Sequence, residues 1–90
     1  MSITYEQYAT NKSNYETYRK MLHNTGYLER KMKENMENNK SIKNIYNIFI
    51  SVKDVELQTY SLDVEYSDKE GYHRRRGVYS EDNLLKMFTK

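Results

Sequence analysis

The residues best suited to bind an anion are three consecutive arginines near the end of the chain, Arg74, Arg75 and Arg76. Guanidinium groups offer planar, paired donors that fit phosphates and carboxylates. In a strand, alternation places Arg74 and Arg76 on the same face as Tyr72, and Arg75 on the opposite face. Two interpretations stay open. The arginines contact an anionic partner, or they form cross-strand ion pairs with Asp63 and Glu65.

A second candidate surface is a stripe of tyrosines in the N-terminal part of the chain. At helical spacing Tyr8, Tyr15 and Tyr18 share one face, and Lys12 and Arg19 flank it. Tyrosine is common in interfaces, because its ring is apolar and its hydroxyl keeps a polar partner. The stripe is therefore either part of the core or a surface that a partner covers, and the partner could be a second copy of this chain.

Catalytic and metal-binding patterns are weak in this sequence. A catalytic triad could be drawn only from residues on neighbouring strands, and such residues lie close together by chance in any hairpin. The carboxylates Asp63 and Glu65 could hold a cation with His73, which would make a metal-dependent enzyme. A wider set could form an oxygen-rich cation site: Asp63, Glu65, Asp68, Glu70 and His73. The spacing matches no calcium loop, and no glycine-rich phosphate loop is present. We predict no catalytic residue, no metal and no cofactor.

Two helices are predicted to precede the strands. Thr4 and Gln7 have capping-box spacing at the start of a helix over 5–24, and Gly26 suits its C-terminal cap. A second helix over 27–39 carries apolar residues at intervals of four: Leu28, Met32 and Met36. The alternative is one long helix that runs through Gly26 at a cost of about 1 kcal/mol.

The apolar period then changes to two, which predicts a three-stranded antiparallel meander. The first strand should bury Tyr46, Ile48, Ile50 and Val52 on one face. A change of parity near Gln58–Thr59 predicts a bulge or break before a second strand over 60–67. A loop at 68–71 leads to a third strand over 72–79. Ser80 should cap a last short helix whose buried residues are Leu84, Met87 and Phe88. The predicted fold is α+β, in the order ααβββα.

Length and composition limit the classes of protein. Ninety residues allow one domain over 1–90, helical over 1–40 and sheet plus helix over 41–90. The ten tyrosines and five methionines must supply much of the core. Without cysteine there is no disulfide scaffold, and no apolar run is long enough to cross a membrane. We expect a cytoplasmic protein. The net charge of +2 is small for a protein that tracks phosphates, so nucleic-acid binding would be local and weak.

In size, polarity and its abundance of Asn, Lys and Tyr, the chain resembles small accessory proteins of phages and mobile elements, including anti-CRISPR proteins. The resemblance implies a non-enzymatic inhibitor that occupies the nucleic-acid-binding surface of a host protein. The αβββα order is also similar to that of double-stranded-RNA-binding domains. The acidic start of the last helix, Glu81 and Asp82, argues against that family.

The sequence therefore predicts a non-enzymatic protein-interaction module, for which a second copy of the chain is one candidate partner. Its predicted partner-binding residues are Tyr8, Lys12, Tyr15, Tyr18, Arg19, Tyr72, Arg74, Arg75 and Arg76. The alternative is a weak DNA- or RNA-binding protein that uses the arginine strand.

Overall fold

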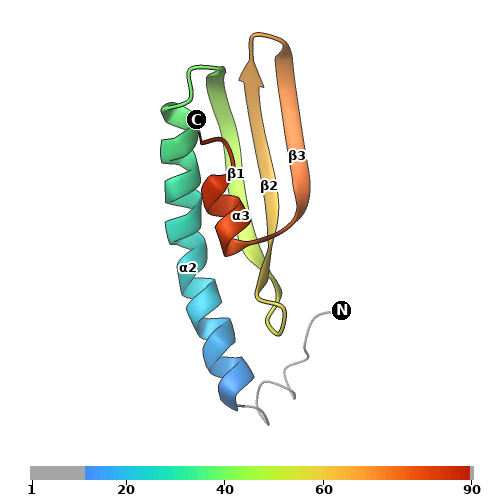
Figure 1. Ribbon diagram of the computed structural model, residues 1–90. Helices are drawn as coiled ribbons and strands as arrows, with labels where there is room; N and C mark the ends of the chain where they lie inside the picture. Colours follow the sequence, from blue (N-terminus) through green and yellow to red (C-terminus); the bar gives the residue numbers. More distant parts are fainter. Residues whose placement is uncertain (1–11, 90) are drawn as a thin grey trace.

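A long helix, three strands and a short helix follow one another along the chain (Figure 1). They are α2 (Lys12–Glu37), β1 (Ile42–Asp54), β2 (Thr59–Asp68), β3 (Gly71–Ser80) and α3 (Glu81–Lys86). The computed structural model describes the backbone of residues 12–89 and the side chains of residues 15–89. The strands form an antiparallel meander in the order β1-β2-β3, as predicted.

The prediction of two N-terminal helices is wrong, because α2 is a single helix that passes through Gly26. Its buried residues Met21, Leu28, Met32 and Met36 continue on one face across the glycine. Burying each such side chain is worth roughly 1.5–3 kcal/mol, which exceeds the helix penalty of one glycine. Packing against the sheet therefore overrides the local stop signal. The predicted start at Thr4 lies outside the described residues.

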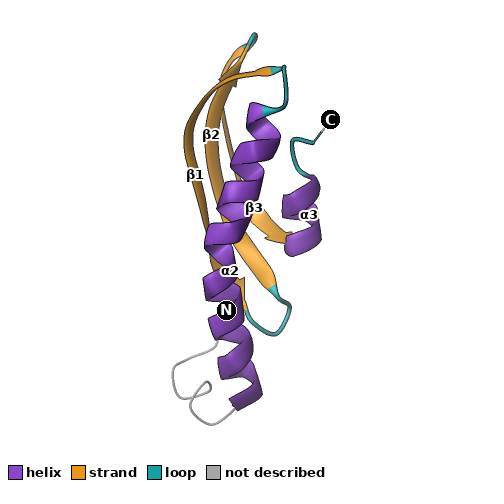
Figure 2. Cartoon of the chain, turned by 90° about the vertical axis from the view of Figure 1, so that its left-hand side faces the viewer, coloured by secondary structure: helices purple, strands orange, loops and turns teal. Residues whose placement is uncertain are grey.

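The core lies between the helices and one face of the sheet. Both α2 and α3 lie against this face, so the molecule has two layers (Figure 2). The buried cluster comprises Met21, Leu28, Met32, Met36, Ile50, Tyr60, Leu62, Val64 and Leu84. The alternating burial of β2 follows directly, because Tyr60, Leu62 and Val64 face the helices while their neighbours point to the opposite side.

One position of β1 departs from the predicted alternation. Tyr46 was expected on the buried face with Ile48, but it is 59% exposed. A register shift between Ile45 and Asn47 inserts an extra residue, so Ile45 packs against the core and Tyr46 points away from it. Beyond this bulge the predicted inner positions Ile48, Ile50 and Val52 all pack in or against the core.

The hairpin loop between β2 and β3 is shorter than the predicted four residues, because Asp68 and Gly71 pair with each other as strand residues and leave a loop of two. The break before β2 and the cap of α3 agree with the sequence. The predicted break near Gln58–Thr59 is confirmed: Gln58 has a left-handed backbone (φ 52°), and β2 begins at the next residue. The Oγ of Ser80 accepts a hydrogen bond from the backbone N–H of Asn83 and caps α3, as predicted. Of the predicted inner residues of the last helix, Leu84 is buried, whereas Met87 and Phe88 follow the helix and pack partly buried against the core.

A buried asparagine connects the loop after α2 to the C-terminal segment. Asn39 Nδ2 donates to the carbonyl of Phe88 at 3.0 Å, and Asn39 Oδ1 accepts from the N–H of Ser41 at 3.0 Å. Its side chain thus satisfies backbone groups of two segments that lie far apart in the sequence.

Candidate interaction surface on the open face of the sheet

The face of the sheet turned away from the helices, here called the open face, carries several large exposed apolar side chains. Its members Tyr46, Phe49, Tyr72 and Val78 are each half or more exposed, and Phe49 is 57% exposed. Because Phe49 pairs with Asp63, and Asp63 with Arg76, all three strands contribute to one continuous surface. Exposed aromatic residues together with arginine are typical of the centre of protein interfaces.

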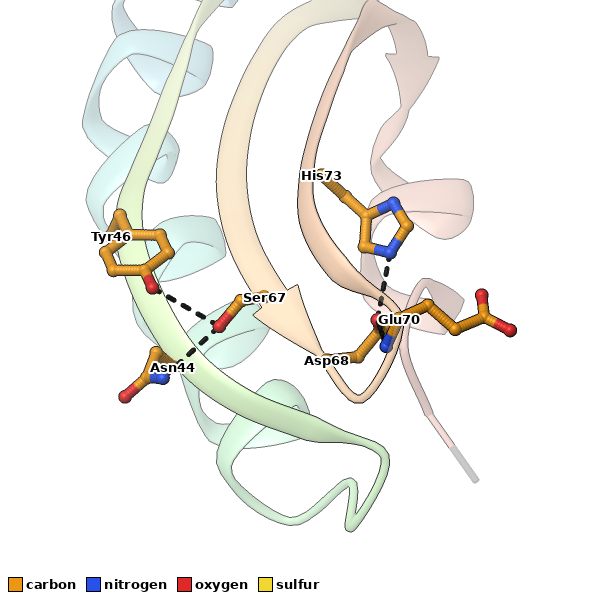
Figure 3. Close-up of polar contacts among 6 residues, drawn as sticks. All are labelled: Asn44, Tyr46, Ser67, Asp68, Glu70 and His73. Atoms are coloured by element: carbon orange, nitrogen blue, oxygen red, sulfur yellow. Dashed lines mark hydrogen bonds and ion pairs between the residues drawn. The ribbon is translucent and has the colours of Figure 1, made fainter.

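Tyr46 and Tyr72 lie near each other across the outer strands. Their ring centroids are 6.2 Å apart and the rings are tilted by 39°. The Tyr46 hydroxyl donates to Ser67 Oγ at 3.3 Å, and Asn44 Nδ2 donates to the same oxygen at 3.2 Å (Figure 3). Ser67 thus fixes the polar end of Tyr46 and leaves much of its ring exposed.

One of the three arginines forms a paired contact on this face. Arg74 Nη2 donates to Asp63 Oδ2 at 2.8 Å, and its Nε donates to Asp63 Oδ1 at 3.1 Å. The hydrogen bond from Arg74 holds the pKa of Asp63 below its usual range, and the same pairing raises the pKa of Arg74. The cross-strand interpretation therefore describes Arg74 well.

Tyr72 is also held by an acid of β2. Its hydroxyl donates to the carboxylate of Glu65, and this hydrogen bond raises the pKa of Tyr72. Glu65 and Asp63 thus orient the two predicted binding residues Tyr72 and Arg74, one acid to each.

Arg76 differs, because it forms no ion pair within the described part of the chain. Its side chain borders a shallow hollow of about 290 Å³, whose lining also includes Phe49 and Val78. Asp63 lines the hollow too, but its carboxylate is engaged by Arg74. Arg76 is therefore a guanidinium beside apolar surface that has donors available for a partner.

Arg75 lies on the other face, as alternation predicted. Its guanidinium sits over the ring of Phe88, 5.6 Å from the centroid. Its partner across β2 is the buried Val64, which confirms the parity. The structure therefore separates the arginine run: two side chains on the open face and one beside the C-terminal segment.

The predicted tyrosine stripe is only partly within the described side chains. Tyr8 and the side chain of Lys12 lie outside them. Tyr15 and Arg19 are exposed on α2, and Tyr18 is half-buried. The stripe is thus neither wholly core nor wholly surface among these residues.

The residues considered as a possible cation site are divided between the two faces of the sheet. Asp63 and Glu65 bind Arg74 and Tyr72 on the open face, whereas His73 contacts Tyr66 on the other face, with ring centroids 5.3 Å apart and the rings tilted by 32°. In the described region one possible ligand group remains, Asp68, Glu70 and His73, with ligand atoms within 4.8 Å. Asp68 Oδ1 already accepts from His73 Nε2 at 3.0 Å and from the N–H of Glu70 at 2.8 Å (Figure 3). These hydrogen bonds lower the pKa of Asp68, that from Glu70 most of all.

Sequence reasoning missed Tyr46 and Phe49 as surface residues. Phe49 stands at the odd position between Ile48 and Ile50, which is a visible signal that it faces outward. No such signal exists for Tyr46, because the bulge that turns it outward has no glycine or proline to mark it.

Comparison with family models, with curated proteins and with solved structures finds no match for this chain. Within the described part of the chain, no helix is both long and apolar enough to span a membrane.

Proposed function

We propose that this chain is a non-enzymatic interaction protein whose open face contacts a protein partner. The observation that carries the proposal is that three exposed aromatic rings, Tyr46, Phe49 and Tyr72, share one continuous surface with Arg76, which forms no ion pair with any described residue. Aromatic and arginine anchors supply most of the binding energy in protein interfaces. The hollow beside Phe49 and Arg76 could receive one apolar side chain of the partner.

The charge of the open face favours a protein over a polyanion. Asp63 and Glu65 lie on the central strand, directly between the aromatic residues of β1 and the arginines of β3. Two carboxylates at the centre would repel a phosphate backbone, whereas a protein surface can place donors opposite them.

In the form suggested by the resemblance, the protein is a cytoplasmic inhibitor that covers the nucleic-acid-binding surface of a host protein. Its acids would then take the place of phosphates, and its arginines would pair with acids of the host. We also propose that the chain self-associates through the exposed Tyr15, Arg19 and Leu22 of α2. This contact is independent of the first, since it leaves the open face available to a partner.

The second candidate is binding of single-stranded nucleic acid. It is favoured by one observation, that the exposed rings lie on a sheet, as in platforms on which bases stack. In that case Phe49 and Tyr72 would stack with bases, and Arg76 would contact a phosphate.

Two parallel measurements test these candidates. The immobilised protein is incubated with cell extract, and bound proteins are quantified for the wild type, Phe49→Ala and the control Leu57→Ala. Leu57 is 73% exposed but lies in the β1–β2 turn, so its loss removes similar apolar surface elsewhere. Labelled single- and double-stranded DNA and RNA are titrated at about 50 and about 200 mM salt.

We expect the wild type to capture one protein ligand in a saturable manner and Phe49→Ala to capture at least tenfold less of it, a typical effect for a central interface residue. Leu57→Ala should retain it. Equal capture by all three proteins would contradict the protein-binding proposal. Micromolar nucleic-acid binding that falls steeply with salt and requires Phe49 would replace it with the second candidate.

A further inference from the structure

The two outer strands of the sheet differ in how their free edges are protected. Unpaired backbone groups at an edge can pair with another strand, and proteins block them with bulges or side chains. The edge of β1 is blocked twice. Its register shifts at three places, and Glu29 of α2 accepts a hydrogen bond from the N–H of Ile50 at 2.8 Å.

Among residues 12–89 no strand pairs with the outer edge of β3, here called its free edge, and this edge is regular. Its ten residues pair with β2 without a register shift, from Asp68↔Gly71 to Thr59↔Ser80. Asp68 and Gly71 flank a two-residue loop, so they form a hydrogen-bonded pair, and the antiparallel ladder alternates from there. The backbone N–H and C=O groups of four residues therefore point to the free edge: Tyr72, Arg74, Arg76 and Val78.

The positive charge of the free edge of β3 determines which kind of strand can pair with it. Between Gly71 and Ser80 there are three arginines and no acid, and the neighbouring acids Asp63 and Glu65 lie on the β2 side. A second copy pairing antiparallel about Arg75 would place Arg74 opposite Arg76, and like charges directly opposite are destabilising. An acidic strand would meet no such repulsion.

We propose that the free edge of β3 binds an extended acidic segment of the protein partner, which adds to the sheet as a fourth strand. This inference rests on the proposed function, because it requires a protein partner. The segment spans Tyr72 to Val78, about seven residues, and carries acids at alternate positions opposite Arg74 and Arg76 on the open face. On the outer side of β3 these acids would lie opposite Arg74 and Arg76. On the inner side, Asp63 and Glu65 of β2 already lie opposite the same two arginines.

Arg76 is the principal charged contact in this arrangement. Arg74 already holds Asp63 with two hydrogen bonds, whereas Arg76 forms no ion pair within the described region. An acid opposite Arg76 can therefore form a paired contact without breaking an existing one.

The test uses the full chain and a capped seven-residue peptide that alternates glutamate and valine. Its binding is titrated by fluorescence anisotropy, and amide hydrogen exchange is followed by NMR. A peptide with lysine in place of glutamate, and one with N-methyl groups that block alternate N–H donors, serve as controls. We expect only the unmodified acidic peptide to bind, and to slow amide exchange at Arg74 and Arg76 at least tenfold.

Two variants of one residue separate the backbone from the side chain. Val78→Pro removes an outward N–H and leaves the ladder to β2 and all arginines, so we expect about tenfold weaker peptide binding. Val78→Ala loses the same valine side chain but keeps the N–H, so it should bind the peptide about tenfold more tightly than Val78→Pro does. If Val78→Pro does not fold, the edge proposal is tested by amide exchange of the wild type with and without the acidic peptide.

Unchanged exchange at Arg74 and Arg76, or equal binding of the lysine peptide, would overturn the edge proposal. Its failure is distinct from failure of the proposed function. If the acidic peptide does not bind but a protein ligand is still captured through Phe49, the edge proposal is wrong and the open-face proposal stands. If capture does not depend on Phe49, the proposed function is wrong whatever the peptides do.

Discussion

Arg74 and Arg76 face the same side of one strand, yet their surroundings give them different roles. Arg74 is engaged by Asp63 in a paired contact, so its loss should change the titration of that acid. Arg76 is only a more distant charge near Asp63 and the last contributor to its lowered pKa. Arg74 thus positions groups within the open face, and Arg76 is the residue available to a partner.

This difference predicts a specific dependence on pH. The folded pKa of Asp63 lies below its unfolded value, so its contribution to stability is complete above about pH 4 and is lost as the pH falls through the folded pKa. In Arg74→Gln the pKa of Asp63 should rise toward its usual range, whereas Arg76→Gln should change it less. A carboxyl-carbon NMR titration of both variants measures this. An unchanged Asp63 titration in Arg74→Gln would show that the pair does not form in solution.

Asn39 is expected to matter for stability rather than for binding. Replacing it with alanine leaves the Phe88 carbonyl and the Ser41 N–H without their partner, which costs about 1–3 kcal/mol in the free energy of unfolding. The exposed neighbour Asn38 is the matched control, and its alanine variant should stay within about 0.5 kcal/mol of the wild type. Urea denaturation of both variants tests the difference. Equal midpoints would contradict the described contacts.

The backbone conformation of Gly26 distinguishes a single continuous α2 from two separate helices. In a continuous helix, with nothing within 4 Å of an added Cβ, Gly26→Ala should raise the free energy of unfolding by about 0.5–1 kcal/mol. At a left-handed helix cap the same change would lower it. Thermal denaturation gives the sign, and the neighbouring Thr25→Ala, which removes a contact to the Leu22 carbonyl, is a reference for the same turn. A destabilised Gly26→Ala would restore the two-helix prediction.

The order of strands and the last helix could be predicted because each has a local signal. Alternation over Tyr60–Val64 identifies β2, and Ser80 followed by acids identifies the start of α3. The continuity of α2 could not be predicted locally, because it depends on Met21 and Leu28 packing on the same sheet. The outward turn of Tyr46 depends on a bulge, which is a property of the paired strands rather than of either sequence alone.

The whole molecule has two layers, and this arrangement leaves exposed the face of the sheet that we propose as the partner-binding surface. The helices cover one face of a three-stranded sheet and leave the other to solvent (Figures 1 and 2). The three arginines lie on a strand, as predicted, and the exposed aromatic residues that share the open face with Arg74 and Arg76 are Tyr72 of the same strand and Tyr46 and Phe49 of β1, not the tyrosines of α2. Sequence patterns identified the residues that share a strand face except at Tyr46, where the bulge in the strand pairing turns the side chain outward.

Site-specific photo-crosslinking tests the open-face proposal most directly. A photoreactive phenylalanine analogue replaces Phe49 in one protein and Leu22, exposed on α2, in another. The proposal predicts a discrete protein adduct from position 49 that excess unlabelled wild type suppresses and excess Phe49→Ala does not. A suppressible adduct from position 22 alone would place the interface on α2, and the absence of any suppressible adduct at position 49 would contradict a binding role for the open face.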